Sequence, residues 1–113
     1  MTNKYGAKAT VVNGIRFASA KEARRYQELL LLQKAGEIDN IELQPEYVLV
    51  YPFVYNGVKY RGVKYRADFR YRVVKNGTVD FVVEDSKGFK NAVYKIKKQM
   101  LLSMYPKINF VEM

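Results

Sequence analysis

Hydrophobic and polar residues alternate through the middle of the chain, which is the pattern of β-strands that bury one face. One such run covers residues 65–74 and a second covers residues 78–85. Asn76-Gly77 separates the two runs, and this pair is a strong hairpin signal because both positions of a two-residue turn require positive φ. The pattern therefore predicts an antiparallel hairpin in which Lys75 pairs with Thr78.

Counting outward from that turn places Asp68 opposite Asp85 on the neighbouring strand. Opposed residues of an antiparallel ladder point to the same face, with Cβ atoms about 4.5–5.5 Å apart. Lys87 follows two residues after Asp85 and therefore shares its face. Two carboxylates that close repel unless a cation lies between them, and a hard cation held by oxygen ligands and water suits them. The hairpin thus predicts a cluster of Asp68, Asp85 and Lys87 around a divalent cation.

Strand-like stretches also precede this hairpin. Residues 47–55 are apolar and β-branched, and Asn56-Gly57 then forms a turn. Residues 58–65 are expected to return as the antiparallel partner, with an interruption at Gly62. Near the start of the chain, Asn13-Gly14 favours a further short hairpin.

A helical pattern replaces the alternation over residues 19–35. Ser19 is a suitable N-cap, Glu22 lies three residues later as in a capping box, and Gly36 supplies the C-terminal stop. Glu22 also shares a helix face with Tyr26, so its carboxylate could point inward from the first turn. Two interpretations of Glu22 stay open: a capping residue only, or an additional ligand for the cation.

The second helical stretch comes after the hairpin. Asn91 can cap a helix over residues 92–104, whose apolar face is expected at Val93, Ile96, Met100 and Met104. Pro106 ends this helix, and residues 108–111 form a final strand. The order is helix, antiparallel strands, helix, strand. It predicts one α/β domain of the α+β type over residues 1–113, with a mixed central sheet.

Charge and composition narrow the function. The chain has 20 Lys and Arg against 11 Asp and Glu, a net charge of +9, and 14% of its residues are aromatic. This balance fits a nucleic-acid partner, although a cationic surface that only aids solubility is the alternative. No Cys or His is present, which excludes thiol and imidazole catalysis and disfavours zinc. The absence of a signal-peptide segment or a long apolar run predicts a cytosolic protein with no membrane partner.

The candidate residues also have purely structural interpretations. Asp68 is two or four positions from three arginines, so on one continuous strand all four would point to the same face. It could therefore be an outward charge paired with Arg66, Arg70 and Arg72. Those arginines could equally form a rim that contacts DNA. Lys87 could be a solvated strand end. Glu84 is adjacent to Asp85 and so points to the opposite face of the strand. It is expected either to hold the metal ligands in place through hydrogen bonds or to pair with a residue on the other face.

Taken together, these segments resemble the PD-(D/E)xK nuclease superfamily, whose restriction-endonuclease-like core runs helix, antiparallel meander, helix, strand. The likeness covers nearly the whole chain from Ser19 onward. It implies that Asp68 is the metal-binding aspartate of the second core strand and that Asp85 and Lys87 form the acid-x-lysine motif. Glu22 would match a glutamate often found on the first helix. The chain departs from the motif in having Ala67 where a proline gives the superfamily its name.

A closer resemblance is to small phage-encoded proteins of unassigned function within that superfamily. It is carried by residues 19–26 (SAKEARRY), by Ala67-Asp68-Phe69 and by residues 83–88 (VEDSKG). The likeness implies a DNA-processing endonuclease acting in the cytoplasm of the phage host cell, in replication, recombination or junction resolution.

The mechanism that these residues allow is metal-assisted hydrolysis of a phosphodiester bond by a Mg²⁺- or Mn²⁺-dependent endodeoxyribonuclease. Asp68 and Asp85 would hold the metal, with the backbone carbonyl of Ser86 and the Glu22 carboxylate as further ligands. Lys87 would orient the attacking water and stabilise developing charge. DNA, including branched DNA, would be held through its phosphates by basic residues of the second helix and the arginine-bearing strand, namely Lys95, Lys97, Lys98, Arg66 and Arg70.

Two other classes stay open. A non-catalytic nucleic-acid-binding module would need only the basic residues and the tyrosines. A structural or interaction protein would show no salt-dependent DNA binding. A symmetric homodimer is a further expectation, because cutting both strands of a duplex takes two sites.

Overall fold

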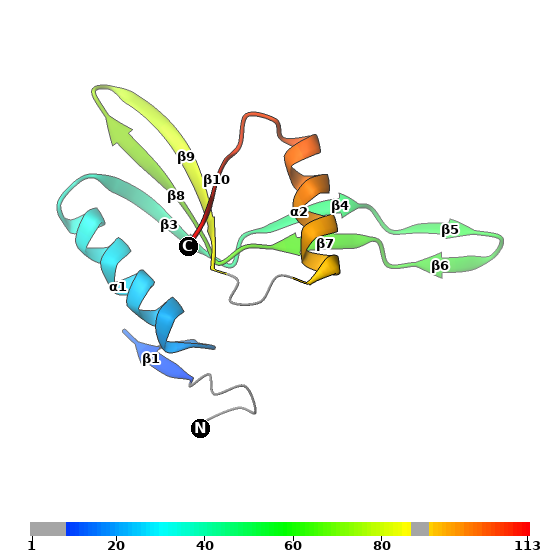
Figure 1. Cartoon of the computed structure of the whole chain (residues 1–113), viewed down its shortest axis with the longest axis horizontal. Coiled ribbons are helices and arrows are strands. Elements are labelled where there is room, and N and C mark those ends of the chain that lie inside the picture. Colours follow the sequence, from blue (N-terminus) through cyan, green and yellow to red (C-terminus); the bar gives the residue numbers. More distant parts are fainter. Residues whose placement is uncertain (1–8, 87–90) are drawn as a thin grey trace.

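The computed structural model describes residues 9–86 and 91–113, and a four-stranded mixed sheet lies at its centre (Figure 1). Its strands are β3 (Ile38–Leu43), β8 (Phe69–Lys75), β9 (Thr78–Asp85) and β10 (Asn109–Glu112), arranged in the order β10-β9-β8-β3. Strand β8 is antiparallel to both β3 and β9, whereas β10 runs parallel to β9. The predicted α+β class and mixed sheet are confirmed.

The β8–β9 hairpin has the register that its turn predicted. Asn76 and Gly77 have φ of 51° and 79°, and Lys75 pairs with Thr78. The ladder continues as far as the pair Phe69–Glu84. Asp68 comes next, in a bend just outside β8, and its backbone N–H donates to the Glu84 carbonyl at 3.0 Å. The register is therefore confirmed up to the residue beside Asp68.

Both helices begin where their capping residues predicted. Helix α1 (Ala20–Lys34) has Ser19 as its N-cap, whose hydroxyl accepts from the Glu22 N–H at 3.2 Å. Helix α2 (Ala92–Met104) has Asn91 as its N-cap, whose side-chain oxygen accepts from the Tyr94 N–H at 2.8 Å. Each cap satisfies one of the backbone N–H groups that a helix start leaves without an intrahelical partner.

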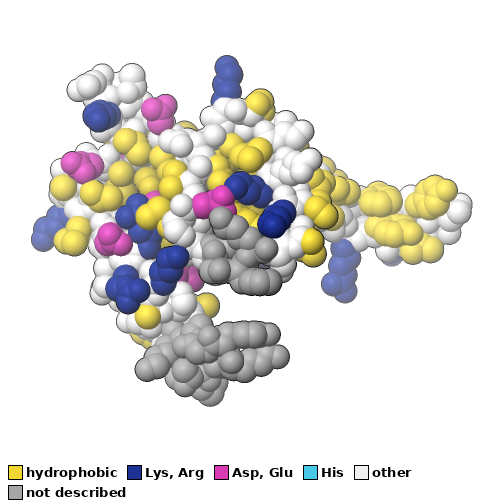
Figure 2. Space-filling model, in the orientation of Figure 1, with side chains coloured by type: hydrophobic (Ala, Val, Ile, Leu, Met, Phe, Trp, Pro, Cys, Tyr) yellow, Lys and Arg dark blue, Asp and Glu magenta, His cyan; other side chains and the backbone are white. Residues whose placement is uncertain are grey.

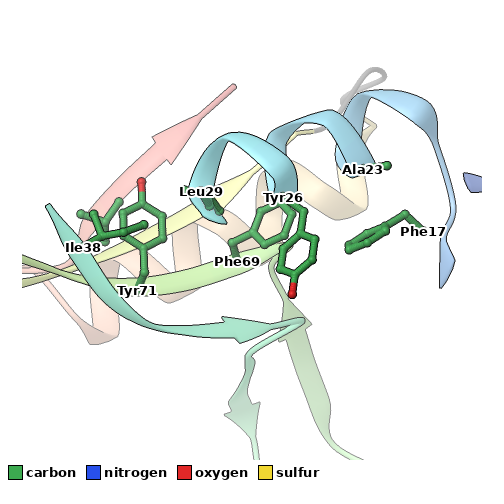
Figure 3. Close-up of a cluster of buried hydrophobic side chains, with 8 residues drawn as sticks. Phe17, Ala23, Tyr26, Leu29, Ile38, Phe69 and Tyr71 are labelled. Carbon is green, nitrogen blue, oxygen red and sulfur yellow. The ribbon is translucent and has the colours of Figure 1, made fainter. Parts of the chain in front are cut away.

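Helix α1 covers one face of the central sheet (Figure 3). The rings of Tyr26 and Phe69 stack at 6.3 Å with 5° between their planes, and Phe17 lies beside both. Phe17 belongs to β2 (Ile15–Phe17), which pairs with β1 (Thr10–Val12) around the predicted Asn13-Gly14 turn. This cluster fixes α1 against β8 and β9.

Helix α2 packs on the opposite face through Tyr94 and Leu101, which are buried with Leu49, Tyr65, Ala67 and Val83. The predicted apolar face of α2 is wrong at three of its four positions, because Val93 and Ile96 are 59% and 60% exposed and Met104 is also exposed. The fourth, Met100, packs against this cluster as expected. That face was predicted only from the spacing of hydrophobic residues along the helix. The buried side of α2 instead needs a side chain with a polar tip, since the Tyr94 hydroxyl donates to Glu112 Oε2 at 2.9 Å.

An excursion between β3 and β8 leaves the central sheet. It begins and ends with the two-stranded ladder of β4 (Glu46–Val50) and β7 (Val63–Arg66). Beyond that ladder, β5 (Phe53–Tyr55) and β6 (Val58–Tyr60) form a hairpin around Asn56-Gly57. We call residues 51–61 the arm. The predicted hairpin exists, but each of its two runs is broken into two strands, and neither joins the central sheet.

The arm forms one end of the longest dimension of the molecule, which measures 54 Å (Figure 1). Gly62 sets its departure, because φ there is +82° and a Cβ atom would lie 2.1 Å from the Val50 carbonyl oxygen. Pro52 has no N–H to continue the β4 ladder. Within residues 9–86 and 91–113, neither helix has the length and apolar character needed to cross a lipid bilayer.

Candidate metal and nucleic-acid site

Strand β9 ends with two buried carboxylates that point to opposite faces of the sheet. Glu84 is 1% exposed and Asp85 is 0% exposed. Because side chains alternate along a strand, Glu84 lies on the side of α1 and Asp85 lies with Val83 on the side of α2. Burial of a charged carboxylate is costly unless partners compensate it, so each of the two requires an explanation.

Glu84 is compensated by an ion pair beneath α1. Arg25 Nε donates to Glu84 Oε1 at 2.8 Å and Arg25 Nη2 donates to Oε2 at 2.7 Å, a bidentate arrangement. The Tyr71 hydroxyl also donates to Oε2. Burial, together with this hydrogen bond, raises the pKa of Tyr71 to about 12. Glu84 therefore pairs on the other face, one of the two roles expected for it.

Asp85 is held by a tyrosine of the neighbouring ladder. The Tyr65 hydroxyl, from β7, donates to Asp85 Oδ2. Burial, together with this hydrogen bond, holds the pKa of the Tyr65 hydroxyl far above its usual value, so it stays a donor. The Tyr65 ring packs 6.2 Å from that of Tyr94 on α2. The ladder that carries the arm is thus joined directly to the Asp85 carboxylate.

Asp68 reaches the backbone that follows Asp85. Its Oδ2 atom accepts hydrogen bonds from the Ser86 N–H at 2.7 Å and from the Ser86 hydroxyl at 2.9 Å. Asp68 is half-buried and Asp85 is fully buried. The structure therefore brings the Asp68 carboxylate against the residue next to Asp85, at the end of two adjacent strands.

The other predicted ligands are less closely associated with this pair. Glu22 is half-buried in the first turn of α1, and its N–H takes part in the cap. Among residues 9–86 and 91–113, no three acidic side chains are grouped closely enough to hold one metal ion, so Glu22 does not form such a group with Asp68 and Asp85. Lys87 and Gly88 lie outside the described residues.

Two residues near Asp85 were missed by sequence reasoning. Tyr65 contacts it directly, and Glu112 of β10 is its partner in the parallel ladder. Glu112 accepts from the Tyr94 hydroxyl and from Lys98 Nζ. The only signal for Glu112 was an acidic residue within the apolar final strand, and its neighbourhood with Asp85 depends on the parallel pairing of β10.

The arginines that flank Asp68 in the sequence pair elsewhere. Arg66 donates to Glu46 at 2.9 Å, and Arg72 binds Asp39 through two hydrogen bonds of 2.6 and 2.7 Å. Arg70 donates to Glu42 and, at 3.2 Å, to the Tyr47 hydroxyl. Each arginine thus meets an acidic residue from the preceding strands. Among the residues described, Asp68 makes no ion pair with any of them, which removes one structural interpretation of Asp68.

The basic residues proposed to contact DNA differ in their availability. Lys95 is exposed and Lys97 is half-buried, whereas Lys98 pairs with Glu112 and lies 5.4 Å from the Phe110 ring centroid. Arg70 is likewise engaged internally. Beside Tyr65 and Tyr94 is a cavity of about 470 Å³, whose lining includes Lys64, Arg66, Asn91 and Lys97. Cationic side chains therefore gather next to the tyrosine that binds Asp85.

The sequence was compared with known proteins, solved structures and family profiles, and only the family comparison gave a match. No curated protein and no solved structure matches it significantly. One family profile, described as a protein of unknown function, matches residues 2–112, which is nearly the whole chain. The protein therefore belongs to the DUF1064 family.

Proposed function

We propose that this protein is a metal-dependent DNA endonuclease that hydrolyses phosphodiester bonds. The observation that carries the proposal is the pairing of Asp68 with the segment that bears Asp85, at the ends of two adjacent strands. Asp85 is fully buried as a carboxylate, although a neutral side chain would be less costly there. An acidic side chain buried at such a position is a candidate functional residue.

The donor set fits a small, hard cation. Asp68 and Asp85 supply carboxylate oxygens, and the backbone carbonyl of Ser86 could supply a third oxygen. Mg²⁺ commonly binds one or two carboxylates and keeps several waters, so a site with two carboxylates is sufficient. Mn²⁺ accepts the same ligands. When bound, such an ion polarises a phosphoryl oxygen and lowers the pKa of a coordinated water.

The residues around the pair have separate tasks in this proposal. Tyr65 holds one oxygen of Asp85 in place through its hydrogen bond. The Ser86 N–H fixes the orientation of the Asp68 carboxylate. Lys87, two residues after Asp85, would orient the attacking water and stabilise negative charge on the phosphoryl group. Glu22 forms no three-carboxylate group with Asp68 and Asp85 among the described residues, so the proposal does not depend on it as a ligand.

DNA would approach along the cationic surface beside Tyr65. Lys64, Arg66 and Lys97 line the cavity there against a single acidic neighbour, Glu46. Lys95 projects from the same helix as Lys97 and is exposed. Contacts of this kind bind phosphates without reading base sequence. Arg70 and Lys98 would have to exchange their internal partners to contribute.

Within this proposal, the protein is a member of the PD-(D/E)xK superfamily. It would be encoded by a phage and would act in the cytoplasm of the host cell. This assignment is supported by the order of the elements, since α1 is followed by antiparallel strands, α2 and the parallel strand β10. Further support comes from the positions of two motif residues, since Asp68 directly precedes β8 and Asp85 ends β9.

A non-catalytic DNA-binding module is the second candidate. It is favoured by the finding that the described residues contain no group of three potential metal ligands. Such a module would bind DNA through the same basic surface and would not depend on the charge of Asp85. Both candidates predict that affinity for duplex DNA falls with salt, with a slope of about −0.9 per phosphate neutralised.

Cleavage of defined DNA structures separates the two candidates. Labelled linear, flap, fork and four-way-junction DNAs would be incubated with the protein in Mg²⁺, in Mn²⁺ and in EDTA. We expect cleavage in either metal and none in EDTA. Binding without cleavage in every metal condition would support the module, and cleavage that proceeds in EDTA would contradict the metal mechanism.

A further inference from the structure

The arm carries an apolar, aromatic face that the rest of the described chain does not cover. Cross-strand pairing sets Phe53 opposite Tyr60 and Tyr55 opposite Val58, so these four side chains share one face of the hairpin. All four are exposed, and Figure 2 shows the hydrophobic side chains that gather on the arm where it projects from the body. A two-stranded hairpin gains no core of its own from such a face.

The rings of this face are held in a fixed arrangement. Phe53 and Tyr60 stack with centroids 4.8 Å apart and 6° between their planes. The hairpin turn is an Asn-Gly pair with positive φ at both positions, and Gly62 fixes the base of the arm against the Val50 carbonyl. Ordered rings with few rotatable bonds lose little conformational entropy on binding, which suits them to recognition.

The charge of the segment identifies the chemistry of its partner. Residues 47–67 contain no Asp or Glu but include four basic residues, Lys59, Arg61, Lys64 and Arg66. Lys59 lies on the arm opposite Val54, on the other face from the rings. Lys64 and Arg66 continue along β7 to the cavity beside Tyr65. Lys64 and Arg66 share one acidic partner, Glu46, so the segment keeps an excess of positive charge. Aromatic rings next to such an excess of cations are the combination that binds single-stranded nucleic acid.

A second copy of this chain fits the arm less well. Three half-exposed rings and one valine offer on the order of 400 Å², against about 800 Å² per partner in a standard protein interface. Two arms brought together would also combine the positive charges of two segments that have no acidic residue within residues 47–67. DNA supplies both the missing negative charge and the flat surfaces.

We propose that the arm binds unpaired DNA bases, which stack on the face formed by Phe53, Tyr55, Val58 and Tyr60. Bases within a duplex already stack on one another, so their ring faces are available only at a single strand, flap, bulge or junction. The proposal rests on the proposed function in one respect, that DNA is the partner. It adds the substrate class, DNA with unpaired bases next to the segment that is cut.

Binding measured in EDTA tests the arm without cleavage. The probes are a fluorescein-labelled duplex, the same duplex with an unpaired bulge, and the single strand, each titrated by anisotropy. Tyr55→Ser removes a ring that is 65% exposed, and Val54→Ser is the matched control on the opposite face, at 64% exposure. We expect Tyr55→Ser to weaken binding of the bulged and single-stranded probes by about 5- to 150-fold, the range of base–aromatic stacking.

The controls fix the interpretation. Duplex affinity should change little in Tyr55→Ser, Val54→Ser should leave all three affinities unchanged, and Tyr55→Phe should restore binding because it keeps the ring. Circular dichroism and sedimentation verify folding and assembly. Equal affinities for Tyr55→Ser and Val54→Ser on unpaired DNA would overturn the proposal. So would a Tyr55→Ser protein that changes from dimer to monomer with unaltered DNA affinity, which would assign the face to a second copy.

Photocrosslinking provides a direct measure of contact. Single-stranded DNA that contains 5-bromouracil should crosslink to a peptide within residues 51–61 of the wild-type protein, and crosslinks confined to other peptides would contradict the proposal. If the arm does not contact DNA but the protein still binds and cleaves DNA, the arm proposal is overturned and the nuclease proposal is unaffected. Absence of any DNA binding by the wild-type protein would remove both.

Discussion

Asp68 Oδ2 accepts a hydrogen bond from the Ser86 N–H at 2.7 Å, so a carboxylate at the start of one strand is fixed to the backbone at the end of the next. Ser86 stands between Asp85 and Lys87 in sequence. This bond, together with one from the Ser86 hydroxyl, links Asp68 to the acid-x-lysine segment. The same bond gives Asp68 a structural role, which must be separated from its proposed metal-binding role in any mutational test.

Substitution of Asp68 separates these two roles. Asp68→Asn keeps an oxygen that can accept from the Ser86 N–H but removes the charge, so we expect near wild-type stability and loss of metal-dependent cleavage. Asp68→Ala also removes the acceptor and should cost about 0.5–1.5 kcal/mol in the free energy of unfolding. Urea unfolding and a gel-based cleavage assay measure the two effects. Full cleavage by Asp68→Asn would exclude Asp68 as a ligand.

Substitution of Asp85 tests the buried charge. Asp85→Asn keeps the side-chain volume and an acceptor for the Tyr65 hydroxyl. Because it removes a charge from a fully buried position, the free energy of unfolding without metal should stay level or rise. Cleavage in Mg²⁺ should be lost, and Mn²⁺ binding measured by calorimetry should fall, while DNA affinity persists. Undiminished cleavage by this variant is incompatible with the metal mechanism.

Replacement of Lys87 should separate catalysis from metal binding. Lys87→Ala removes a donor to the developing charge, and loss of one such donor typically lowers the rate by about 10²–10³. Calorimetry should show Mn²⁺ binding unchanged, since an ammonium group is not a metal ligand. Lys95→Ala is the control, because it removes an exposed charge of the same type on α2. An equal loss of rate in both variants would indicate a general effect of charge on DNA binding.

The parts of the structure that sequence predicted are those set by local chemistry. The Asn76-Gly77 turn determined the β8–β9 register, because the turn geometry admits one pairing of Lys75 with Thr78. Ser19 and Asn91 determined the helix starts through their side-chain oxygens. Each of these features depends on residues a few positions apart, so no knowledge of the tertiary structure was needed.

The parts that sequence missed depend on contacts between distant elements. Alternation in residues 47–65 predicted strands but could not tell that they form an arm outside the central sheet. Hydrophobicity selected Val93 and Ile96 for the buried side of α2, whereas Tyr94 is buried and its hydroxyl donates a hydrogen bond to Glu112. The internal ion pair of Lys98 with Glu112 likewise follows from the position of β10.

Loss of Arg25 should destabilise the fold severely. Arg25→Met leaves the Glu84 carboxylate buried without its bidentate partner, and breaking such a pair costs about 3–5 kcal/mol. Arg72→Met is the matched control, because its partner Asp39 is exposed and such pairs contribute about 0–1 kcal/mol. The double variant Arg25→Met/Glu84→Met should recover stability, since neither charge of this pair then remains buried. Similar losses in Arg25→Met and Arg72→Met, measured by urea unfolding, would contradict this assignment.

Alkaline pH should weaken the fold through Tyr71. Burial and the hydrogen bond to Glu84 raise the pKa of Tyr71 from 10.0 to about 12 in the folded protein. Between those values the unfolded chain releases the hydroxyl proton and the folded protein keeps it, so stability is fully present below pH 10 and decreases as pH rises toward 12. Tyr71→Phe has no proton to lose, so its urea midpoint should decline less than that of the wild type over this range. Tyr55→Phe, which removes an exposed hydroxyl on the arm, is the control and should follow the wild-type curve. Parallel curves for Tyr71→Phe and the wild type would show that the Tyr71–Glu84 bond does not govern the alkaline limit.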